Sequence, residues 1–288
     1  MRLLINHQTN YFYGELAQRS VQYIRMTPMP LAHQTIHRWQ VMLPKVGALQ
    51  KDGFGNEWVT LCRNEAHNNL QMQARGEVEI NPATEFIPDD PSVPYRLFTI
   101  ATPLTTCGEA MRAFTQEHLQ GFFDADSESN SVADKRQMLQ NLAQALLQKM
   151  PYTKGVTHVG TTASEAFELG AGVCQDHSHV FIACLRDLNI PARYVSGYIY
   201  EASDAMMASH AWAEVWLDGN WYTFDVSNQH FTPNCHVYVA IGRDYLDAAP
   251  VRGVRLGGGY ENLFSQVMVT ALPSYCLLYT SPSPRDRG

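Results

Sequence analysis

The feature that most constrains this chain is the stretch GAGVCQDHSHVFIACLRDLNIP, residues 170–191. Its Gly-Ala-Gly start predicts a tight turn, and apolar residues then recur at helical spacing. Asn189 is suited to a left-handed cap, and Pro191 cannot continue a helix, so the stop signal is strong. We therefore expect a buried helix that begins at Cys174, directly after the glycine turn.

The position of Cys174 suggests a chemical role. A thiol in the first turn of a helix lies at the positive end of the helix dipole, beside N–H groups that lack intrahelical acceptors. Both favour the thiolate, which is the nucleophilic form. The turn alone leaves an alternative open, because most free cysteines are small buried apolar residues. Residues further along the chain are needed to choose between the two.

Composition argues against several classes of protein. A net charge of −7 and a pI near 5.9 make a nucleic-acid partner unexpected. No apolar run reaches the ~18 residues of a membrane span, and residues 1–10 become polar too early for a secretory signal. The six cysteines show no C-x-x-C spacing. We therefore expect reduced thiols in a cytoplasmic protein, with no disulfide framework and no membrane partner.

Residue patterning divides the chain into four segments. Residues 1–81 hold short β-rich runs separated by Pro and Gly, which predicts a β-sandwich-like N-terminal domain. Residues 82–106 hold five prolines and predict an extended connection. Residues 107–273 combine helical and strand patterns and form the expected second domain. The composition shifts from about Ser274, and the final PSPRDRG has no core residues, so we expect residues 274–288 to be a disordered or non-native tail.

Two amphipathic helices are predicted ahead of the Cys174 helix. Residues 108–121 and 132–150 each carry apolar residues on one side. Ser131 is placed to cap the second helix, with Asp134 three residues further on. Both helices are expected to cover the core of the second domain.

A hairpin follows the Cys174 helix. Residues 209–217 and 221–226 alternate in the manner of strands, and Asp218-Gly219 between them is the strongest short hairpin signal. A two-residue loop at this point pairs Leu217 with Asn220, which fixes the register of the whole hairpin.

That register brings two polar residues together. It places Trp212 opposite Asp225, with His210 as the diagonal neighbour of Asp225 on the same face. Diagonal neighbours lie ~7–8 Å apart at the backbone, within reach of an imidazole and a carboxylate. A shift of one residue would move Asp225 to the opposite face. The spacing therefore predicts a hydrogen bond between His210 and Asp225.

Cys174, His210 and Asp225 supply a nucleophile, its base and a group that orients the base. They lie on a helix start and two neighbouring strands, so packing the helix on the hairpin can bring them together. The backbone N–H of Cys174 is the expected oxyanion donor, with the Gln175 side chain as a weaker candidate for a second. Trp212 is expected to wall the substrate cleft, although a plain core aromatic is an equally good interpretation.

A metal site is the competing interpretation of these residues. Cys174, His177 and His210 together resemble a set of zinc ligands in residue type. His177 and His179, however, are two residues apart on a helix and face away from each other. Metal-ligand spacing is absent elsewhere in the chain. We therefore expect neither a metal nor another cofactor.

At this point a family resemblance is clear. The segments GVCQDHSHVFIACLRDLNIPARYVSGYIY and SHAWAEVWLDGNWYTFDVSN resemble the bacterial transglutaminase-like family. The blocks around Cys174, His210 and Asp225 match that family's catalytic triad in type, order and context. DGFGN and AIGRDYLDAAPVRGV resemble its N-terminal β domain and its C-terminal segment. Val226 and Ser227 depart from the pattern, since many members have Pro-Thr there.

The resemblance implies an α+β fold, in which a helical layer packs on an antiparallel sheet in a papain-like core. It also implies acyl transfer through a thioester at Cys174. Members resembling this chain include peptidases or amidases, which use water as acceptor, and cross-linking transferases, which use an amine. We therefore expect an enzyme that acts on amide bonds of a peptide or protein substrate. A non-catalytic peptide-binding module that retains the cleft is the alternative, and a structural or metal-binding domain is the third possibility.

Overall fold

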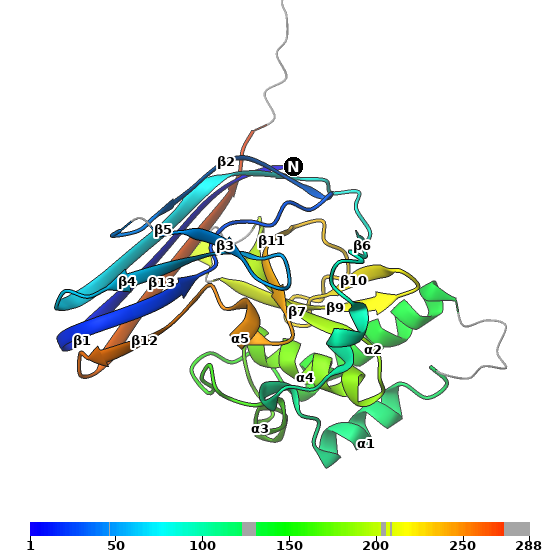
Figure 1. Cartoon of the computed structure of the whole chain (residues 1–288). Helices are drawn as coiled ribbons and strands as arrows, with labels where there is room; N and C mark the ends of the chain where they lie inside the picture. The colour runs from blue at the N-terminus through cyan, green and yellow to red at the C-terminus, as the bar shows by residue number, and fades with distance from the viewer. Residues whose placement is uncertain (46, 123–130, 203–205, 208, 274–288) are drawn as a thin grey trace, which may run out of the picture.

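The computed structural model describes residues 1–45, 47–122, 131–202, 206–207 and 209–273 (Figure 1). These residues form two antiparallel sheets, and helices pack on the second sheet. The α+β fold class expected from the sequence is thus confirmed. The expected tail, residues 274–288, lies outside the described residues. No helix among the described residues is both long enough and apolar enough to cross a membrane.

The first sheet is organised around one long strand, β1, which spans Arg2–Ile24. The first part of β1 pairs with β5 and β13, and the register shifts between Phe12 and Ala17. The last part pairs with β4 and β12. The other strands of this sheet are β2 (Gln34–Met42), β3 (Leu49–Lys51), β4 (Glu57–Arg63), β5 (His67–Ile80), β8 (Met206–Met207), β12 (Val251–Gly257) and β13 (Glu261–Ala271).

The composition of this sheet corrects the expected domain boundary. The sequence assigned residues 107–273 to one domain, yet β12 and β13 both pair with β1. The C-terminal strands therefore complete the N-terminal sheet. Pairing between strands so far apart in sequence depends on the tertiary fold, which local strand patterns do not specify.

The second sheet has the strand order β11-β7-β9-β10-β6. Strand β6 comes from the proline-rich connection and pairs with the edge of β10. The bounds of the five strands are β6 (Ile87–Pro88), β7 (Ala192–Ile199), β9 (His210–Leu217), β10 (Asn220–Phe224) and β11 (His236–Gly242).

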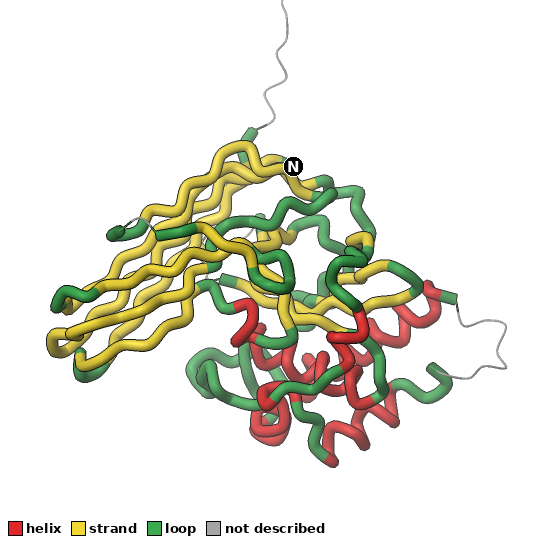
Figure 2. The backbone as a smooth tube through the Cα atoms, in the orientation of Figure 1, coloured by secondary structure: helices red, strands yellow, loops and turns green. Residues whose placement is uncertain are grey.

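Helices cover one face of this sheet, as Figure 2 shows. The face carries alternate residues of β9, such as Ala213 and Val215, which pack in one cluster with the helices. The helices are α1 (Glu109–His118), α2 (Val132–Lys149), α3 (Ala163–Leu169) and α4 (Cys174–Asp187), and a short α5 (Tyr245–Ala248) follows β11.

The opposite face of the sheet is covered by the connection and by the first domain. Val93 and Phe98 of the connection pack on Trp212 and Trp221 of the sheet. This segment includes two short 3-10 helices, Tyr95–Thr99 and Pro103–Thr105. The connection is thus a folded layer of the core as well as a link between the two sheets.

Helix α4 is the centre of the second domain, since eleven of its fourteen residues are buried. Its predicted limits are confirmed: the helix begins at Cys174, and Asn189 has the left-handed φ of 57° beyond its end. Ser131 caps α2 as expected, because its side chain accepts a hydrogen bond from the Asp134 N–H. Helix α3 was not predicted, and it carries its own capping box at Thr162 and Glu165.

Candidate active site

The glycine turn places Cys174 at the N-terminus of helix α4. Gly170 ends α3 with a left-handed φ of 67°. A Cβ at Gly172 would lie 2.7 Å from the Cβ and Oδ2 of Asp176, so only glycine fits there. The Oδ2 atom of Asp176 accepts hydrogen bonds from the Val173 N–H at 2.8 Å and from Thr157 Oγ1 at 2.7 Å. The turn is therefore locked to the first turn of the helix, next to the partly exposed Cys174.

The hairpin has the predicted register. Asp218 and Gly219 form its loop with φ values of 47° and 86°. Leu217 lies opposite Asn220, and the ladder continues to Ala213 and Phe224. Both central residues of a type I′ turn need positive φ, which explains the Asp-Gly sequence.

The same register joins His210 to Asp225. His210 Nε2 donates to Asp225 Oδ2 at 2.7 Å, and both side chains are buried. Cys174 lines the same cavity as His210 and lies near enough to the ring to raise the pKa of His210. The three residues that the sequence selected therefore meet at one place, where helix α4 packs on strand β9.

The electrostatics of His210 favour the imidazolium. Burial disfavours the charged ring, but attraction by the Asp225 carboxylate, the hydrogen bond that this carboxylate accepts from the ring, and the neighbouring Cys174 outweigh it. Together they raise the pKa of His210 well above its ordinary value. A charged imidazole beside a thiol is the arrangement that a thiolate–imidazolium pair requires.

Asp225 is held by more donors than the sequence suggested. Its Oδ2 also accepts from His236 Nε2 at 3.1 Å and from Asn228 Nδ2 at 3.1 Å, and its Oδ1 accepts from the Asn228 N–H at 3.2 Å. Burial opposes the charged carboxylate, yet His210 and His236 hold the pKa of Asp225 far below its usual range. Burial in turn lowers the pKa of His236, so this ring is a neutral donor.

Sequence reasoning missed His236 and Asn228. His236 opens β11, which is separated from β9 by β7 in the sheet. His236 lies next to Asp225 because of the order of the strands in the sheet, and no local sequence pattern predicts that order. Asn228 follows directly on the departure from the family pattern at Val226 and Ser227. Its position three residues after a predicted site carboxylate was the one local signal that could have identified it, since such residues often hydrogen bond back to the carboxylate.

The alternative zinc site lacks an available ligand at His177. The Nδ1 atom of His177 lies 2.8 Å from Ser227 Oγ, and its Nε2 atom lies 2.7 Å from the Met150 carbonyl oxygen. His210, Asp225 and His236 form a cluster whose ligand atoms lie within 4.8 Å of one another. Both imidazole Nε2 atoms already donate to Asp225, so a metal would have to displace those hydrogen bonds.

A cavity of about 370 Å³ opens in front of Cys174 and His210. Gln175 lines it, and its side-chain amide donates to the Val159 carbonyl oxygen at 3.1 Å. One of the two N–H groups of the Gln175 amide is therefore already used in a hydrogen bond. The remaining walls come mainly from aromatic and apolar residues and one cation: Tyr152, Lys154, Val159, Val173, Tyr194, Ala211, Tyr245 and Pro250.

Trp212 does not line this cavity. Its side chain is fully buried, and its ring centroid lies 6.0 Å from that of His210. It packs on His236 and Tyr238. The expectation that Trp212 walls the cleft is therefore replaced by the other interpretation, a core aromatic that supports His210.

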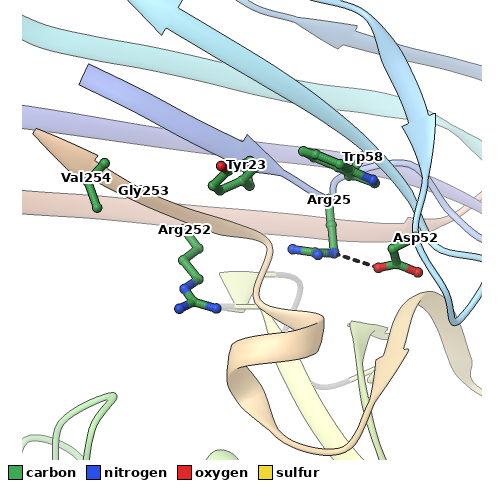
Figure 3. Close-up of a pocket in the computed structure, with 7 residues that line it drawn as sticks. All are labelled: Tyr23, Arg25, Asp52, Trp58, Arg252, Gly253 and Val254. Atoms are coloured by element: carbon green, nitrogen blue, oxygen red, sulfur yellow. Dashed lines mark hydrogen bonds and ion pairs between the residues drawn. The ribbon is translucent and has the colours of Figure 1, made fainter. Parts of the chain in front are cut away.

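A second cavity, of about 330 Å³, lies on the first sheet (Figure 3). It is lined by Tyr23, Arg25, Asp52, Trp58, Arg252, Gly253 and Val254. It shares no residue with the cavity at Cys174 and carries neither a cysteine nor a histidine. Of these two cavities, only the first therefore has a cysteine and a histidine among its lining residues.

Comparison with known proteins agrees with this geometry. Residues 3–79 match the bacterial transglutaminase-like N-terminal region, and residues 125–226 match the transglutaminase-like superfamily core. The chain belongs to the transglutaminase-like superfamily. The matched core includes Cys174, His210 and Asp225.

Relatives of this transglutaminase-like chain extend over nearly its whole length. An uncharacterized protein of Mycobacterium leprae is 27% identical, over 94% of this chain and 99% of that protein. An uncharacterized protein of Mycobacterium tuberculosis is 28% identical, over 94% of this chain and 93% of that protein. A crystal structure of a candidate cysteine protease from Cytophaga hutchinsonii is 21% identical, with a TM-score of 0.72, over 96% of this chain and 92% of that chain. That likeness shows a shared fold for both sheets and the helical layer.

Proposed function

We propose that the chain is a cysteine-dependent acyl-transfer enzyme that acts on amide bonds of peptides or proteins. One observation carries the proposal. A partly exposed thiol at a helix N-terminus lies beside an imidazole that a buried carboxylate holds, and a cavity opens in front of both. Membership of the transglutaminase-like superfamily supports the same reaction class.

The first half of the reaction forms a thioester. The Cys174 thiolate attacks the substrate carbonyl carbon, the S–C bond forms, and the carbonyl electrons move to oxygen. The N–H of Cys174, at the first position of α4, stabilises that oxyanion. The C–N bond then breaks, and the His210 imidazolium gives its proton to the leaving amine.

The second half regenerates the thiolate–imidazolium pair. Neutral His210 removes a proton from water or from an amine, which attacks the thioester carbon. The C–S bond breaks, and the acyl group leaves as a carboxylic acid or as a new amide. Asp225 orients the His210 ring in both halves and stabilises its charged form.

The cavity supports a peptide as the substrate class. Tyr152, Tyr194 and Tyr245 line it together with apolar side chains, and Lys154 is the one charged residue besides His210 among its lining residues. Such walls suit an apolar or aromatic side chain on a neutral or acidic peptide, whereas a basic peptide would meet the Lys154 charge. Volumes of this order are typical of sites for small ligands or short segments.

Mass spectrometry of a peptide mixture tests the proposal. The protein is incubated with glutamine-containing peptides, with and without a primary amine, and each possible reaction leaves a distinct mass change. We expect cleavage, deamidation or amine incorporation with the wild-type chain and with Cys62→Ala, which alters an exposed cysteine elsewhere. Cys174→Ala should abolish every product. Peptide binding with no product and no acyl-enzyme would favour a peptide-binding module instead.

A further inference from the structure

The cavity in Figure 3 is built on one face of three adjacent strands. Tyr23 of β1 lies opposite Arg252 of β12 on one side and Thr60 of β4 on the other. Side chains two residues apart on a strand share a face. Arg25 therefore follows Tyr23 on that face, and Trp58 follows Thr60. The sheet register itself thus gathers two cations and two aromatic rings around one hollow.

The charges in this hollow do not balance. Arg25 and Arg252 are the cations, and Asp52 is the one acid among the lining residues. Arg25 Nε donates to Asp52 Oδ2 at 3.3 Å. In the part of the chain that the structure describes, Arg252 makes no ion pair, and its Nη1 donates to the Leu246 carbonyl oxygen at 3.2 Å. The excess of positive charge is local, because the whole chain has a net charge of −7.

Asp52 is also occupied elsewhere. Its carboxylate accepts hydrogen bonds from the Phe54 N–H at 2.9 Å, the Asn56 N–H at 3.0 Å and Asn56 Nδ2 at 3.0 Å. These bonds fix the turn between β3 and β4. Asp52 reaches Arg25 through Nε alone, and Figure 3 shows the rest of the Arg25 guanidinium turned away from Asp52, on the side of Arg252. Both guanidinium groups therefore belong to residues that line the same hollow.

The remaining walls are aromatic. The rings of Tyr23 and Trp58 lie 5.1 Å apart at an interplanar angle of 54°. Guanidinium groups pair with carboxylates through two parallel N–H···O bonds, and aromatic walls favour flat apolar groups. An inorganic anion would contact the arginines but would have no apolar group to pack on these rings.

We propose that this hollow binds a small carboxylate-bearing ligand with an attached aromatic or other flat group. The carboxylate lies between Arg25 and Arg252, and the flat group packs on Tyr23 and Trp58. The volume of about 330 Å³ accommodates a ligand of this size. The site is separate from Cys174, so the assignment does not depend on the proposed acyl-transfer function.

Three probes separate the two parts of the assignment. Phenylacetate carries the charge and the ring, acetate carries the charge alone, and phenylacetamide carries the ring alone. Isothermal titration of the whole chain at low ionic strength should show saturable binding of phenylacetate, with weaker binding of acetate and of phenylacetamide. Equal binding of phenylacetamide would overturn the role of the arginines, and equal binding of acetate would overturn the role of the rings.

A charge-matched pair of variants locates the site. Arg252→Gln removes one guanidinium from an exposed position, and Arg19→Gln makes the same charge change at another exposed position of the same sheet. Loss of a charge-assisted hydrogen bond predicts roughly tenfold weaker phenylacetate binding in Arg252→Gln. Arg19→Gln should bind as the wild type does, and both variants should melt at the wild-type temperature. Wild-type affinity in Arg252→Gln, or no saturable binding by the wild type, would overturn the proposal.

Discussion

His236 donates through Nε2 to Oδ2 of Asp225 at 3.1 Å, the same oxygen that accepts from His210 at 2.7 Å. The two histidines differ in charge although they share an acceptor. The pKa of His210 is raised and that of His236 is lowered. Burial is the largest influence on both rings. At His210, however, the attraction of Asp225 and the contact with Cys174 outweigh it. His236 therefore acts as a fixed neutral support for the carboxylate, and His210 is the ring that can hold the working proton.

The reactivity of Cys174 is the most direct test of the site. We expect iodoacetamide at pH 7 to alkylate Cys174 faster than any other cysteine, because the neighbouring imidazolium stabilises its thiolate. Peptide mapping of a time course identifies the labelled residue. His210→Gln should slow the labelling of Cys174, whereas labelling of exposed Cys62 should be unchanged in that variant. Equal rates at Cys174 and Cys62 in the wild type would argue against an activated thiol.

Replacing Asp225 by Asn should separate orientation from folding. Asn keeps the size of the side chain but offers an N–H where the Nε2–H groups of His210 and His236 need an acceptor. Loss of the correct tautomer in a comparable triad lowers turnover by roughly 10⁴-fold, and we expect a loss of 10²-fold or more in kcat here. The readout is kcat against KM for a peptide found by the mass assay. A kcat within a factor of two of the wild-type value would remove Asp225 from the mechanism.

Gly172→Ala tests the turn that carries Cys174. The added Cβ would press on the Asp176 side chain at 2.7 Å, and that side chain caps α4 through the Val173 N–H. We expect a loss of about 1–3 kcal/mol in the free energy of unfolding, together with slower alkylation of Cys174. Gly53→Ala is the matched control, since no atom lies within 4 Å of a Cβ built there. Denaturant unfolding measures both, and equal stability of the two variants would contradict the steric argument.

Buried neutral histidines make the fold sensitive to acid. Burial lowers the pKa of His7 from 6.5 to about 4. Between about pH 6.5 and pH 4 the unfolded chain binds a proton at this ring that the folded chain does not, so stability falls as the pH falls. At about 1.4 kcal/mol per pKa unit, this one residue contributes at most about 3–4 kcal/mol.

The corresponding variant is His7→Gln, which cannot take up that proton. We expect the decline in the free energy of unfolding from pH 7 to pH 4 to be smaller in His7→Gln than in the wild type. His37→Gln changes an exposed histidine that pairs with Glu79, and because an exposed ion pair contributes little, this variant should alter the pH dependence less than His7→Gln does. Urea unfolding at several pH values gives the comparison. Parallel curves for His7→Gln and the wild type would show that His7 is charged in the folded protein.

Local patterns were sufficient wherever short-range geometry decides the structure. Helix α4 begins at Cys174 because a glycine turn precedes it, and Asn189 and Pro191 end it. The Asp218-Gly219 loop fixes a two-residue hairpin, and strand alternation then brings His210 to Asp225. These are relations between residues at most fifteen positions apart on one helix or one hairpin.

Other predictions failed where packing over longer distances decides the outcome. Alternation correctly placed Trp212 on the face of His210, but it could not show that Phe98 and Val93 of the connection cover that face. Helix α3 was missed because its seven residues carry too short an apolar pattern. The sequence assigned β12 and β13 to the second domain because an alternating pattern predicts a strand but does not predict which strand it pairs with.

The sequence by itself determined the three residues of the candidate site, their order and the local elements that present them. The tertiary structure decided that helix α4 packs on β9 with Cys174 against His210, that His236 and Asn228 complete the environment of Asp225, and that the C-terminal strands join β1. The physical reason is the distance along the sequence over which each interaction acts. Turn hydrogen bonds and side-chain periodicity involve residues close in sequence. The order of strands in a sheet depends on the burial of apolar faces from distant parts of the chain.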